Sequence, residues 1–506
     1  MPPAEQLYAE NLALKSEVGG MRTVLSEMHE EVARLKLQLD WLRKRLFGPG
    51  RGETLDRAQL LLQLEALEKI AARVPAPVQT VTYERAPPRP AARPGPAELF
   101  AKLPVKETIE LVPEEVQQQP ECYEKIGEER TFEVDVVPPQ LFKREIVRPK
   151  YQRRTDKSLP PVIAPAPARL APGGYVSAGL MAFVLTAKYV DHLPLYRQEK
   201  QLARWGAAIS RQTMCEWTAL GSNWLESIYQ HMFRDLRAGG YVQADETPVR
   251  CQDPDVPGKT VQGWLWVVSR PGGDVCFTWR MSRRHEEAAT LLTGFKGLLQ
   301  SDGYEAYASV AAANDGIVHV GCWAHARRYF HDAIEEAPVR AGFLLRLIGH
   351  LYHLEKTWDD AGIVQPVLRA QRRQSEFGLT LRLLKRTAQR LRELSLPKSL
   401  LGQACSYLLG HWDVLVAHCE HGRTRIDNNL IENAIRPSAL GKKNWLFIGH
   451  PDAGDRSAII YSLVVSCQRR GIDPFAYLKD VLTRLPKMTN QDDLAALTPA
   501  RWRPPS

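Results

Sequence analysis

The stretch that most constrains the fold of this chain covers residues 241–248. Its residues alternate, with apolar Val242 and Ala244 on one face and Asp245 on the other, which is the two-residue period of a β-strand. Pro248 has no N–H group to donate to a neighbouring strand, so the strand is expected to end there. We therefore predict a strand that places the carboxylate of Asp245 near its end.

Further strands follow this one closely. Residues 263–268 and 274–279 are rich in tryptophan and valine, and a Pro-Gly-Gly turn lies between them. A helical segment at about 284–295 then leads to an apolar run at 298–299 and to Asp302. Three strands, a helix and a fourth strand, with an aspartate at the first strand and at the fourth, are typical of the opening of a ribonuclease H-like fold.

This α/β core is expected to extend over residues 238–450. A fifth strand is predicted at 317–320, and the leucine- and arginine-rich helices after it are interpreted as an insertion at about 335–422. After the insertion, a helix carries Glu432. Two further parts are expected after the core: C-terminal helices at 451–485 and a loose tail at 486–506. The whole chain is thus predicted to be a multidomain α+β protein.

Residues 1–48 carry a heptad repeat. Leucine or methionine recurs at one position of the repeat and apolar residues at the other, with Asn11 as the polar exception. Such a pattern favours a leucine-zipper coiled coil of two parallel helices, in which a buried asparagine fixes the register. We therefore expect a homodimer or a higher oligomer through residues 7–46. An amphipathic helix packed on its own chain is the alternative.

A linker rich in proline, alanine and arginine follows at residues 74–98. The next unit, residues 99–158, is predicted to be small, basic and formed of β-strands. Its residues 131–136 alternate cleanly, and residues 141–147 are expected to pair with them.

Residues 175–237 have helical spacing and resemble a helix-turn-helix. A glycine turn at Gly206 separates one helix from a second that begins after Ser210. Ser210 as the N-cap would place Arg211 and Gln212 on the first turn, which is how such a unit presents side chains to a DNA groove. We interpret the region as a candidate DNA-binding unit, with a helical hairpin that does not touch DNA as the alternative.

The chain has 506 residues and a formal net charge of +9, which favours a polyanionic partner about as much as it favours simple solubility. It contains no run of about 18 apolar residues, so neither a membrane span nor a membrane partner is expected. The eight cysteines are scattered without a Cys-x-x-Cys pair. They indicate reduced thiols in a cytoplasmic protein.

Three carboxylates that lie far apart in the sequence are predicted to converge: Asp245, Asp302 and Glu432. Phosphodiester cleavage needs an activated nucleophile and a stabilised leaving oxygen, and two Mg²⁺ ions about 3.5–4 Å apart provide both. Carboxylate oxygens are ligands that Mg²⁺ prefers. A single aspartate at a strand end is more often a turn cap, so the inference depends on the ordered set of three.

Five stretches carry a resemblance to a known family: residues 244–248, 301–304, 322–328, 428–437 and 441–445. Together they resemble the aspartate-aspartate-glutamate (DDE) transposases of the insertion sequence 66 family, and the resemblance covers nearly the whole chain. It implies that Asp245, Asp302 and Glu432 form the catalytic triad. It also implies cleavage at both ends of a DNA element, joining of the freed 3′ hydroxyls to target DNA, and small accessory proteins encoded by the same element.

The chain departs from this family at one place. Family members often carry a cysteine-rich zinc-binding unit where residues 115–155 here contain only Cys122, whereas tetrahedral zinc needs four ligands. We therefore expect a β unit without zinc. Cys322 and His325 have the spacing of half a zinc site, but a buried thiol and a histidine near the active site are the favoured interpretation.

Basic residues follow Glu432 closely, namely Arg436, Lys442 and Lys443. We expect them to hold the phosphates that flank the cut, with an exposed basic loop as the alternative. Pro437 is expected to end or kink the helix that carries Glu432.

The sequence therefore predicts a cytoplasmic, nucleoid-associated transposase that acts on double-stranded DNA with two Mg²⁺ ions, or with Mn²⁺ in their place. Two alternatives stay open. A ribonuclease H-like nuclease or resolvase would hydrolyse DNA without joining it. A DNA-binding regulator would carry the same core in a catalytically dead form.

Overall fold

The computed structural model describes most of the chain after residue 138. The described residues are 105, 108, 114–118, 120–122, 139–152, 154, 162–489 and 491–505. The chain divides into two compact units, Met1–Pro139 and Gln140–Ser506. The described elements of the first unit are a short helix α4 (Glu114–Gln118) and a 3-10 turn (Pro120–Cys122). The predicted coiled coil, the proline-rich linker and the predicted strand at 131–136 lie outside the described residues.

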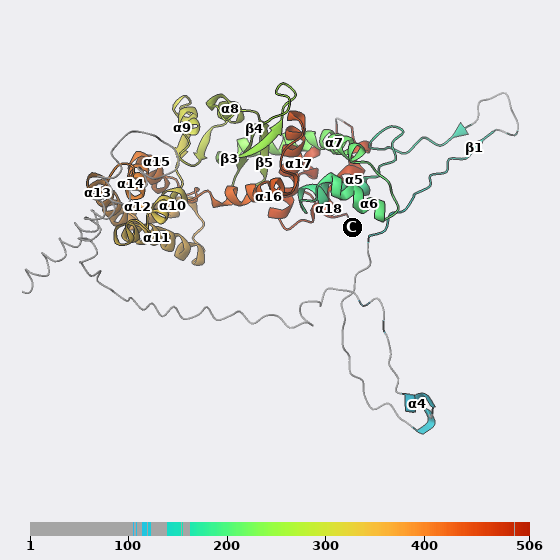
Figure 1. Cartoon of the computed structure of the whole chain (residues 1–506), viewed down its shortest axis with the longest axis horizontal. Coiled ribbons are helices and arrows are strands. Elements are labelled where there is room, and N and C mark those ends of the chain that lie inside the picture. Colours follow the sequence, from blue (N-terminus) through green and yellow to red (C-terminus); the bar gives the residue numbers. More distant parts are fainter. Residues whose placement is uncertain are drawn as a thin grey trace, which may run out of the picture. The chain divides into compact units, whose positions relative to one another are not determined.

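A five-stranded mixed sheet forms the centre of the second unit (Figure 1). Its strands are β3 (Tyr241–Gln252), β4 (Thr260–Ser269), β5 (Val275–Arg280), β6 (Gly297–Gln300) and β7 (Ile317–Val320). Their spatial order is β5-β4-β3-β6-β7; the first three are antiparallel, whereas β6 runs parallel to β3 and β7 parallel to β6. Each strand covers a segment for which the sequence predicted a strand, and the described part of the chain is of the mixed α+β class.

The first of these strands differs from its prediction, because β3 continues through Pro248. Pro248 pairs in register with Trp264 of β4, and its carbonyl oxygen accepts a hydrogen bond of 3.1 Å from Lys442 Nζ. The N–H and C=O of a strand residue point to the same side, so the missing N–H of Pro248 faces away from β4. Since β6 pairs only with residues 241–243 of β3, no strand lacks a hydrogen bond there.

Four helices pack around the sheet and against one another: α5 (Ala178–Tyr189), α7 (Arg211–Ala238), α17 (Pro451–Arg469) and α18 (Pro474–Arg484). Of these, α17 covers the outer edge of β5 (Figure 1). The hydroxyl groups of Ser462 and Ser466 accept hydrogen bonds from the N–H groups of Phe277 and Val275, at 2.8 and 2.9 Å. The two serines thereby satisfy the backbone of an edge strand.

The helix-turn-helix form predicted around Ser210 is present. Ser210 is the N-cap of α7, and its side chain accepts a hydrogen bond from the N–H of Thr213. The preceding helix α6 (Leu195–Arg204) ends before Gly206, whose φ of +89° favours glycine. Contact of this region with DNA stays a prediction.

A second group of helices lies in the chain between β7 and the helix α16 (Asn429–Trp445). Its members are α10 (Trp323–Asp332), α11 (Pro338–Asp360), α12 (Pro366–Glu376), α13 (Gly378–Leu394), α14 (Leu400–Gly410) and α15 (Trp412–Val416). This group has a hydrophobic core of its own, which includes Trp323, Leu344 and Phe377. It adjoins the β7 edge of the sheet, against which α15 and the following 3-10 turn pack.

A buried ion pair fixes this helical group to the segment that returns to the sheet. Arg373 has no exposed surface and binds both carboxylate oxygens of Glu355, at 2.5 and 3.1 Å. It also donates to the carbonyl oxygens of His418 (3.0 Å) and Thr424 (2.7 Å). Because a buried charge without a partner is strongly destabilising, helices α11 and α12 and the returning segment depend on one another.

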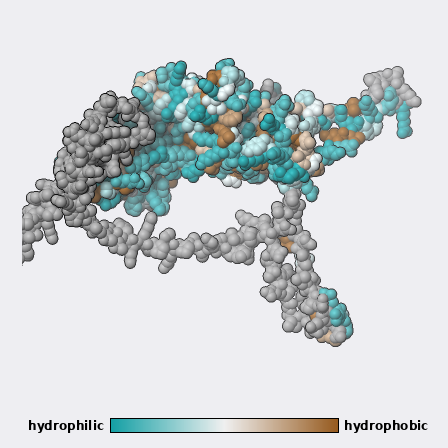
Figure 2. All heavy atoms as spheres, in the orientation of Figure 1, coloured by the Kyte–Doolittle hydropathy of each residue, from teal (hydrophilic) through white to brown (hydrophobic). Residues whose placement is uncertain are grey.

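The predicted strand at 141–147 is replaced by a shorter pair, β1 (Lys150–Tyr151) and β2 (Val162–Ile163). Phe142 and Val147 are 79% and 73% exposed, so this segment has no core against which a longer strand packs. Apolar areas are visible on the arm that carries β1, whereas most of the described surface in view is hydrophilic (Figure 2). None of the helices in the described ranges is long and apolar enough to cross a membrane.

The tail from residue 486 was expected to be loose, and this prediction was wrong. Trp502 is 5% exposed, its indole N–H donates to Asp480 Oδ2 at 2.8 Å, and its ring meets that of Tyr477 edge to face. Trp502 thus packs the tail against α18, although the sequence around it is polar and rich in proline.

Replacing Arg373 by methionine is expected to lower the free energy of unfolding by about 3–5 kcal/mol, because Glu355 would be left buried without its partner. The neighbouring Arg372 forms an exposed pair with Glu376 at 2.7 Å, so Arg372→Ala should lower it by only about 0–1 kcal/mol. Urea unfolding followed by tryptophan fluorescence measures both variants. Equal losses in the two would contradict the role assigned to the buried pair.

Candidate active site

Two of the predicted site residues lie at the same level of the sheet, Asp245 within β3 and Asp302 just beyond the end of β6. Gln243 of β3 is paired with Gln300, the last residue of β6. Asp245 and Asp302 each follow their glutamine by two positions. Since adjacent strands lie about 4.8 Å apart, the two aspartates lie side by side where β6 ends, although β3 itself continues to Gln252 and Asp245 is not near its end as predicted.

The backbone orients both aspartate carboxylates. The N–H of Glu246 donates to Asp245 Oδ1 at 2.8 Å, and the N–H of Tyr304 donates to Asp302 Oδ1 at 2.9 Å. Neither carboxylate forms an ion pair with a cationic side chain in the part of the chain that the structure describes. Neither carboxylate therefore has a neighbouring cation that would stabilise its charged form.

The third predicted residue, Glu432, lies in the first turn of α16, which packs against β3 and β4. Ile431, Ala434 and Ile435 are buried on one face of this helix. The helix neither ends at Pro437 nor before it but continues to Trp445. The carbonyl that loses its helical partner at Pro437 belongs to residue 433, which is exposed and so accessible to solvent.

Two side chains of α10 reach Glu432. Arg328 Nη2 lies 3.2 Å from Glu432 Oε2, and His325 Nε2 lies 3.7 Å from Oε1. Burial lowers the pKa of His325, although the negative charges of Asp302 and Glu432 oppose that shift. The histidine is thus close to two of the three acids and mainly neutral at pH 7. Cys322 lies apart from them, bonded to the Asn428 amide oxygen at 2.9 Å.

The three acids influence one another electrostatically. Burial raises the pKa of Asp245 to about 8, and the negative charges of Glu246, Asp302 and Glu432 add to the shift. The hydrogen bond from the N–H of Glu246 opposes it. Three carboxylates from β3, from the loop after β6 and from α16 thus act on one place, where an additional positive charge would be stabilised.

The oxygen-only donor set fits a hard divalent cation such as Mg²⁺ in its chemistry, and the raised pKa of Asp245 indicates a negative potential that a cation would relieve. The side-chain positions fit less well. In the described ranges, no three histidine, cysteine, aspartate or glutamate side chains are close enough to hold one ion together. Glu432 is engaged by Arg328.

Sequence reasoning missed Glu246 and its partners. The Glu246 side chain is 1% exposed and pairs with Arg283 at 2.6 Å, while the hydroxyl of Tyr307 donates to its other oxygen at 2.7 Å. Glu246 stands next to Asp245 in the sequence, but nothing in the sequence indicates which of the two acids has a cationic partner. The structure shows that Glu246 has one.

The basic residues predicted to hold phosphates occupy two different faces of α16. At 100° per residue, Arg436 and Lys443 fall within about 40° of Glu432 around the helix, and both are exposed. Lys442 instead reaches the carbonyl oxygen of Pro248. On the other candidate DNA-binding element, Arg211 and Gln212 are exposed on the first turn of α7.

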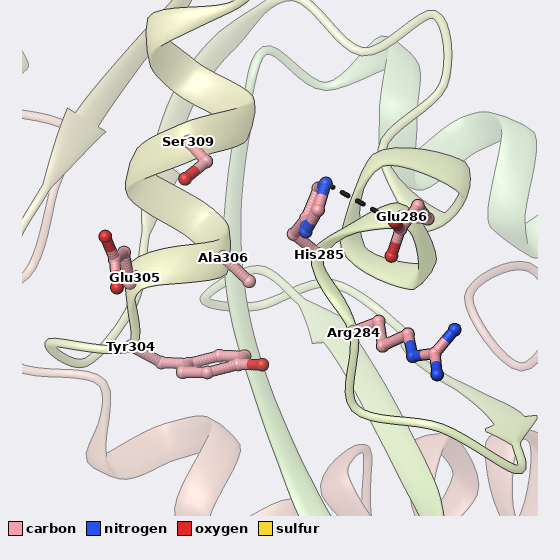
Figure 3. A pocket seen from close by; sticks show the side chains of 7 residues that line it. All are labelled: Arg284, His285, Glu286, Tyr304, Glu305, Ala306 and Ser309. Atoms are coloured by element: carbon pink, nitrogen blue, oxygen red, sulfur yellow. Dashed lines mark ion pairs between the residues drawn. The ribbon is translucent and has the colours of Figure 1, made fainter.

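A groove of about 570 Å³ opens beside the loop that follows Asp302. Tyr304, Glu305 and the start of α9 (Glu305–Ala312) line one side, and Arg284 with the start of α8 (His285–Leu291) lines the other (Figure 3). The three acids of the site are not among its lining residues. The groove therefore borders the acidic cluster but does not contain it.

Comparison with known families decides what kind of protein carries this site. The profile of a family described as "Transposase IS66 family" matches residues 173–456, which include the sheet, the helical group and all three acids. The chain belongs to the IS66 family of transposases. Family membership implies a DNA-processing enzyme that depends on a divalent metal ion.

The transposase matches two further profiles of the same system. One, described as "IS66 C-terminal element", covers residues 462–500, and the other, "Transposase C of IS166 homeodomain", covers residues 34–108. The second lies where the sequence predicted the end of the zipper and the linker, and it implies DNA binding. The DNA-binding residues named from the sequence lie in later segments of the chain.

Relatives of the transposase occur in Sinorhizobium fredii (strain NBRC 101917 / NGR234). One, "Uncharacterized protein y4qI", is 32% identical over 97% of this chain and 93% of its own length. Another, "Uncharacterized protein y4jD", is 31% identical over 75% of this chain and 76% of its own length. The likeness to the first therefore extends from end to end.

The raised pKa of Asp245 predicts how stability depends on pH without metal. Between pH of about 4 and about 8 the unfolded chain has released the proton that the folded protein keeps, so stability should fall as pH rises. The asparagine of Asp245→Asn has no proton to release. The melting temperature of this variant minus that of the wild type should therefore be larger at about pH 8.5 than at about pH 5. Scanning calorimetry with a chelator measures this difference.

The control for this experiment is Asp315→Asn, which removes an exposed carboxylate of the β6–β7 connection. The difference between its melting temperature and that of the wild type should be the same at both pH values. If the melting temperature of Asp245→Asn minus that of the wild type stays constant or becomes smaller as pH rises, the raised pKa of Asp245 is contradicted.

Proposed function

We propose that this transposase cleaves the ends of its DNA element and joins the freed 3′ hydroxyls to double-stranded target DNA, with Asp245, Asp302 and Glu432 as the catalytic, metal-binding residues. The observation that carries the proposal is the pairing of Gln243 with Gln300, which brings Asp245 and Asp302 to the same level, while the charge of Glu432 also acts on Asp245. A buried group whose pKa is shifted by specific charged neighbours is a candidate functional site.

The proposal includes a ribonuclease H-like core at residues 238–450 with a helical insertion at about 335–422. The strand order β5-β4-β3-β6-β7, with three antiparallel strands followed by two parallel ones, supports it. In such a core the ends of adjacent parallel strands offer rigid mounting for the first two acids. The facing helix α16 provides the third.

The roles of the acids follow from where they are mounted. Asp245 would hold the cations from within strand β3 and Asp302 from the loop that follows β6, and Glu432 would complete the ligand set after turning away from Arg328. When bound, two Mg²⁺ ions, or Mn²⁺ in their place, activate the attacking hydroxyl and stabilise the leaving oxygen. Zinc has no part in the proposal. Arg436 and Lys443 share the exposed face of α16 with Glu432 and would bind the flanking phosphates.

DNA recognition and assembly complete the proposal. The family's homeodomain match at residues 34–108 supports binding of the element ends there, and the exposed Arg211 and Gln212 at the start of α7 would add contacts. Residues 7–46 would join two copies as a zipper, because both element ends must be held before either is joined. Small accessory proteins of the same element, and a cytoplasmic, nucleoid-associated location, belong to the same proposal.

Replacing Asp302 by asparagine, or Glu432 by glutamine, should lower the rate of end cleavage by about 100-fold or more, because either change removes a charged metal ligand. Binding of the end duplex should be unchanged, since neither residue is proposed to read DNA. Glu305→Gln is the matched control: this exposed carboxylate lies three residues after Asp302 and outside the acidic cluster. Cleavage of a labelled end duplex and its gel shift provide the two readouts.

The same labelled duplex separates the proposed function from its alternatives. A transposase forms a joined product with target DNA in the presence of Mg²⁺, whereas a nuclease or resolvase would yield cut ends alone. Cleavage that persists in Asp302→Asn would overturn the assignment of the acids. Binding without any cleavage by the wild type would indicate a regulator.

A further inference from the structure

Arg283 lies in the connection between β5 and α8, a part of the chain to which neither the sequence nor the family assigns a role. Its Nε and Nη2 both donate to Glu246 Oε1, at 2.9 and 2.6 Å. The second oxygen of Glu246 accepts the hydroxyl of Tyr307 at 2.7 Å. Glu246 thus has both oxygens engaged in a site where its side chain is 1% exposed.

The guanidinium of Arg283 also lies between two aromatic rings. It stands 4.0 Å from the centre of the Tyr304 ring and 4.9 Å from that of Trp264. In addition, the hydroxyl of Tyr304 donates a hydrogen bond to the carbonyl oxygen of Arg283. Tyr304 is therefore held to Arg283 through its ring and through its hydroxyl.

These contacts connect the segments that carry the first two acids. The N–H of Glu246 binds the carboxylate of Asp245, and the N–H of Tyr304 binds the carboxylate of Asp302. A continuous path of contacts thus runs from Asp245 through Glu246, Arg283 and Tyr304 to Asp302. Asp302 lies in a loop beyond the end of β6, where no strand pairing fixes it, so a tie of this kind decides where its carboxylate stands.

We propose that Arg283 is a positioning residue that clamps the Asp302 loop to the strand carrying Asp245 and so sets the separation of the two carboxylates. The inference rests on the proposed function, because that separation matters only if the two carboxylates share metal ions. Arginine suits the role because its planar group offers two parallel N–H donors on one edge and flat faces for stacking. Lysine offers neither.

A nearby ion pair provides a control for the contacts of Arg283. Arg280 Nε pairs with Glu287 Oε2 at 3.0 Å, and its side chain is 32% exposed, compared with 40% for Arg283. The Arg280–Glu287 pair touches neither Glu246 nor Tyr304. Arg280→Lys is therefore a matched control, with the same chemical change at a comparable exposure and three residues away.

The test compares Arg283→Lys with Arg280→Lys in the full chain. Binding of Mn²⁺ to the protein without DNA is measured by calorimetry, and cleavage of the labelled end duplex is measured over a range of Mg²⁺ concentrations. Arg283→Lys should weaken Mn²⁺ binding and slow cleavage by about 10-fold or more, which is the usual effect of removing a partner of a metal ligand. Arg280→Lys should change neither, and both variants should bind the end duplex as the wild type does.

A second variant keeps the test decisive if Arg283→Lys folds poorly. Tyr304→Phe retains the stacked ring and removes only the hydroxyl that ties the loop to Arg283. It should weaken Mn²⁺ binding with the melting temperature and end binding unchanged, a combination that a merely structural role would not produce. Wild-type Mn²⁺ binding in Tyr304→Phe, or in folded Arg283→Lys, overturns the clamp. Undiminished cleavage by Asp302→Asn would instead overturn the proposed function, so the two failures are distinguishable.

Discussion

A pair of buried glutamines holds the candidate site together. Gln243 and Gln300 have no exposed surface, and Gln243 Nε2 donates to Gln300 Oε1 at 2.9 Å. The same amides donate to the carbonyl oxygens of Asp427 (3.0 Å) and Arg425 (2.8 Å). Each glutamine stands two residues before an aspartate of the site, and the two carbonyls lie shortly before Glu432. Because hydrogen bonds are strongly directional and hard to replace in a low-dielectric interior, this network ties all three acidic segments together.

The helical group between β7 and α16 contributes to the same arrangement from the other side. It has its own hydrophobic core, and Arg373 binds the carbonyl oxygens of the segment that leads from it back to the sheet. The start of α16, and with it Glu432, is therefore placed by two frameworks at once. This explains why a long run of helices interrupts the chain between the second and the third acid without loosening the site. The helical group therefore helps to position Glu432.

Some acids of the site have a cationic partner and others do not. Glu246 is neutralised by Arg283, and Glu432 lies against Arg328. Asp245 and Asp302 have no such partner among the described residues, and their mutual repulsion adds to the effect of burial on the pKa of Asp245. Two acids without a cationic partner thus lie next to each other, one in β3 and one just beyond β6. A metal ion would meet the least competition from protein cations at this place.

The sequence by itself determined the strands, the N-cap at Ser210 and the choice of three candidate acids, since these depend on periodicity and on local chemistry. The predictions for Pro248 and for the tail were wrong. The effect of a missing N–H depends on whether a neighbouring strand faces it, and the effect of a single tryptophan depends on whether another element packs against it. Only the tertiary structure decided that Asp245 and Asp302 share a level, that Arg283 belongs to Glu246, and that Arg328 faces Glu432. These are contacts between residues that lie far apart in the sequence. The residue pattern of one segment does not indicate which distant segment it will contact.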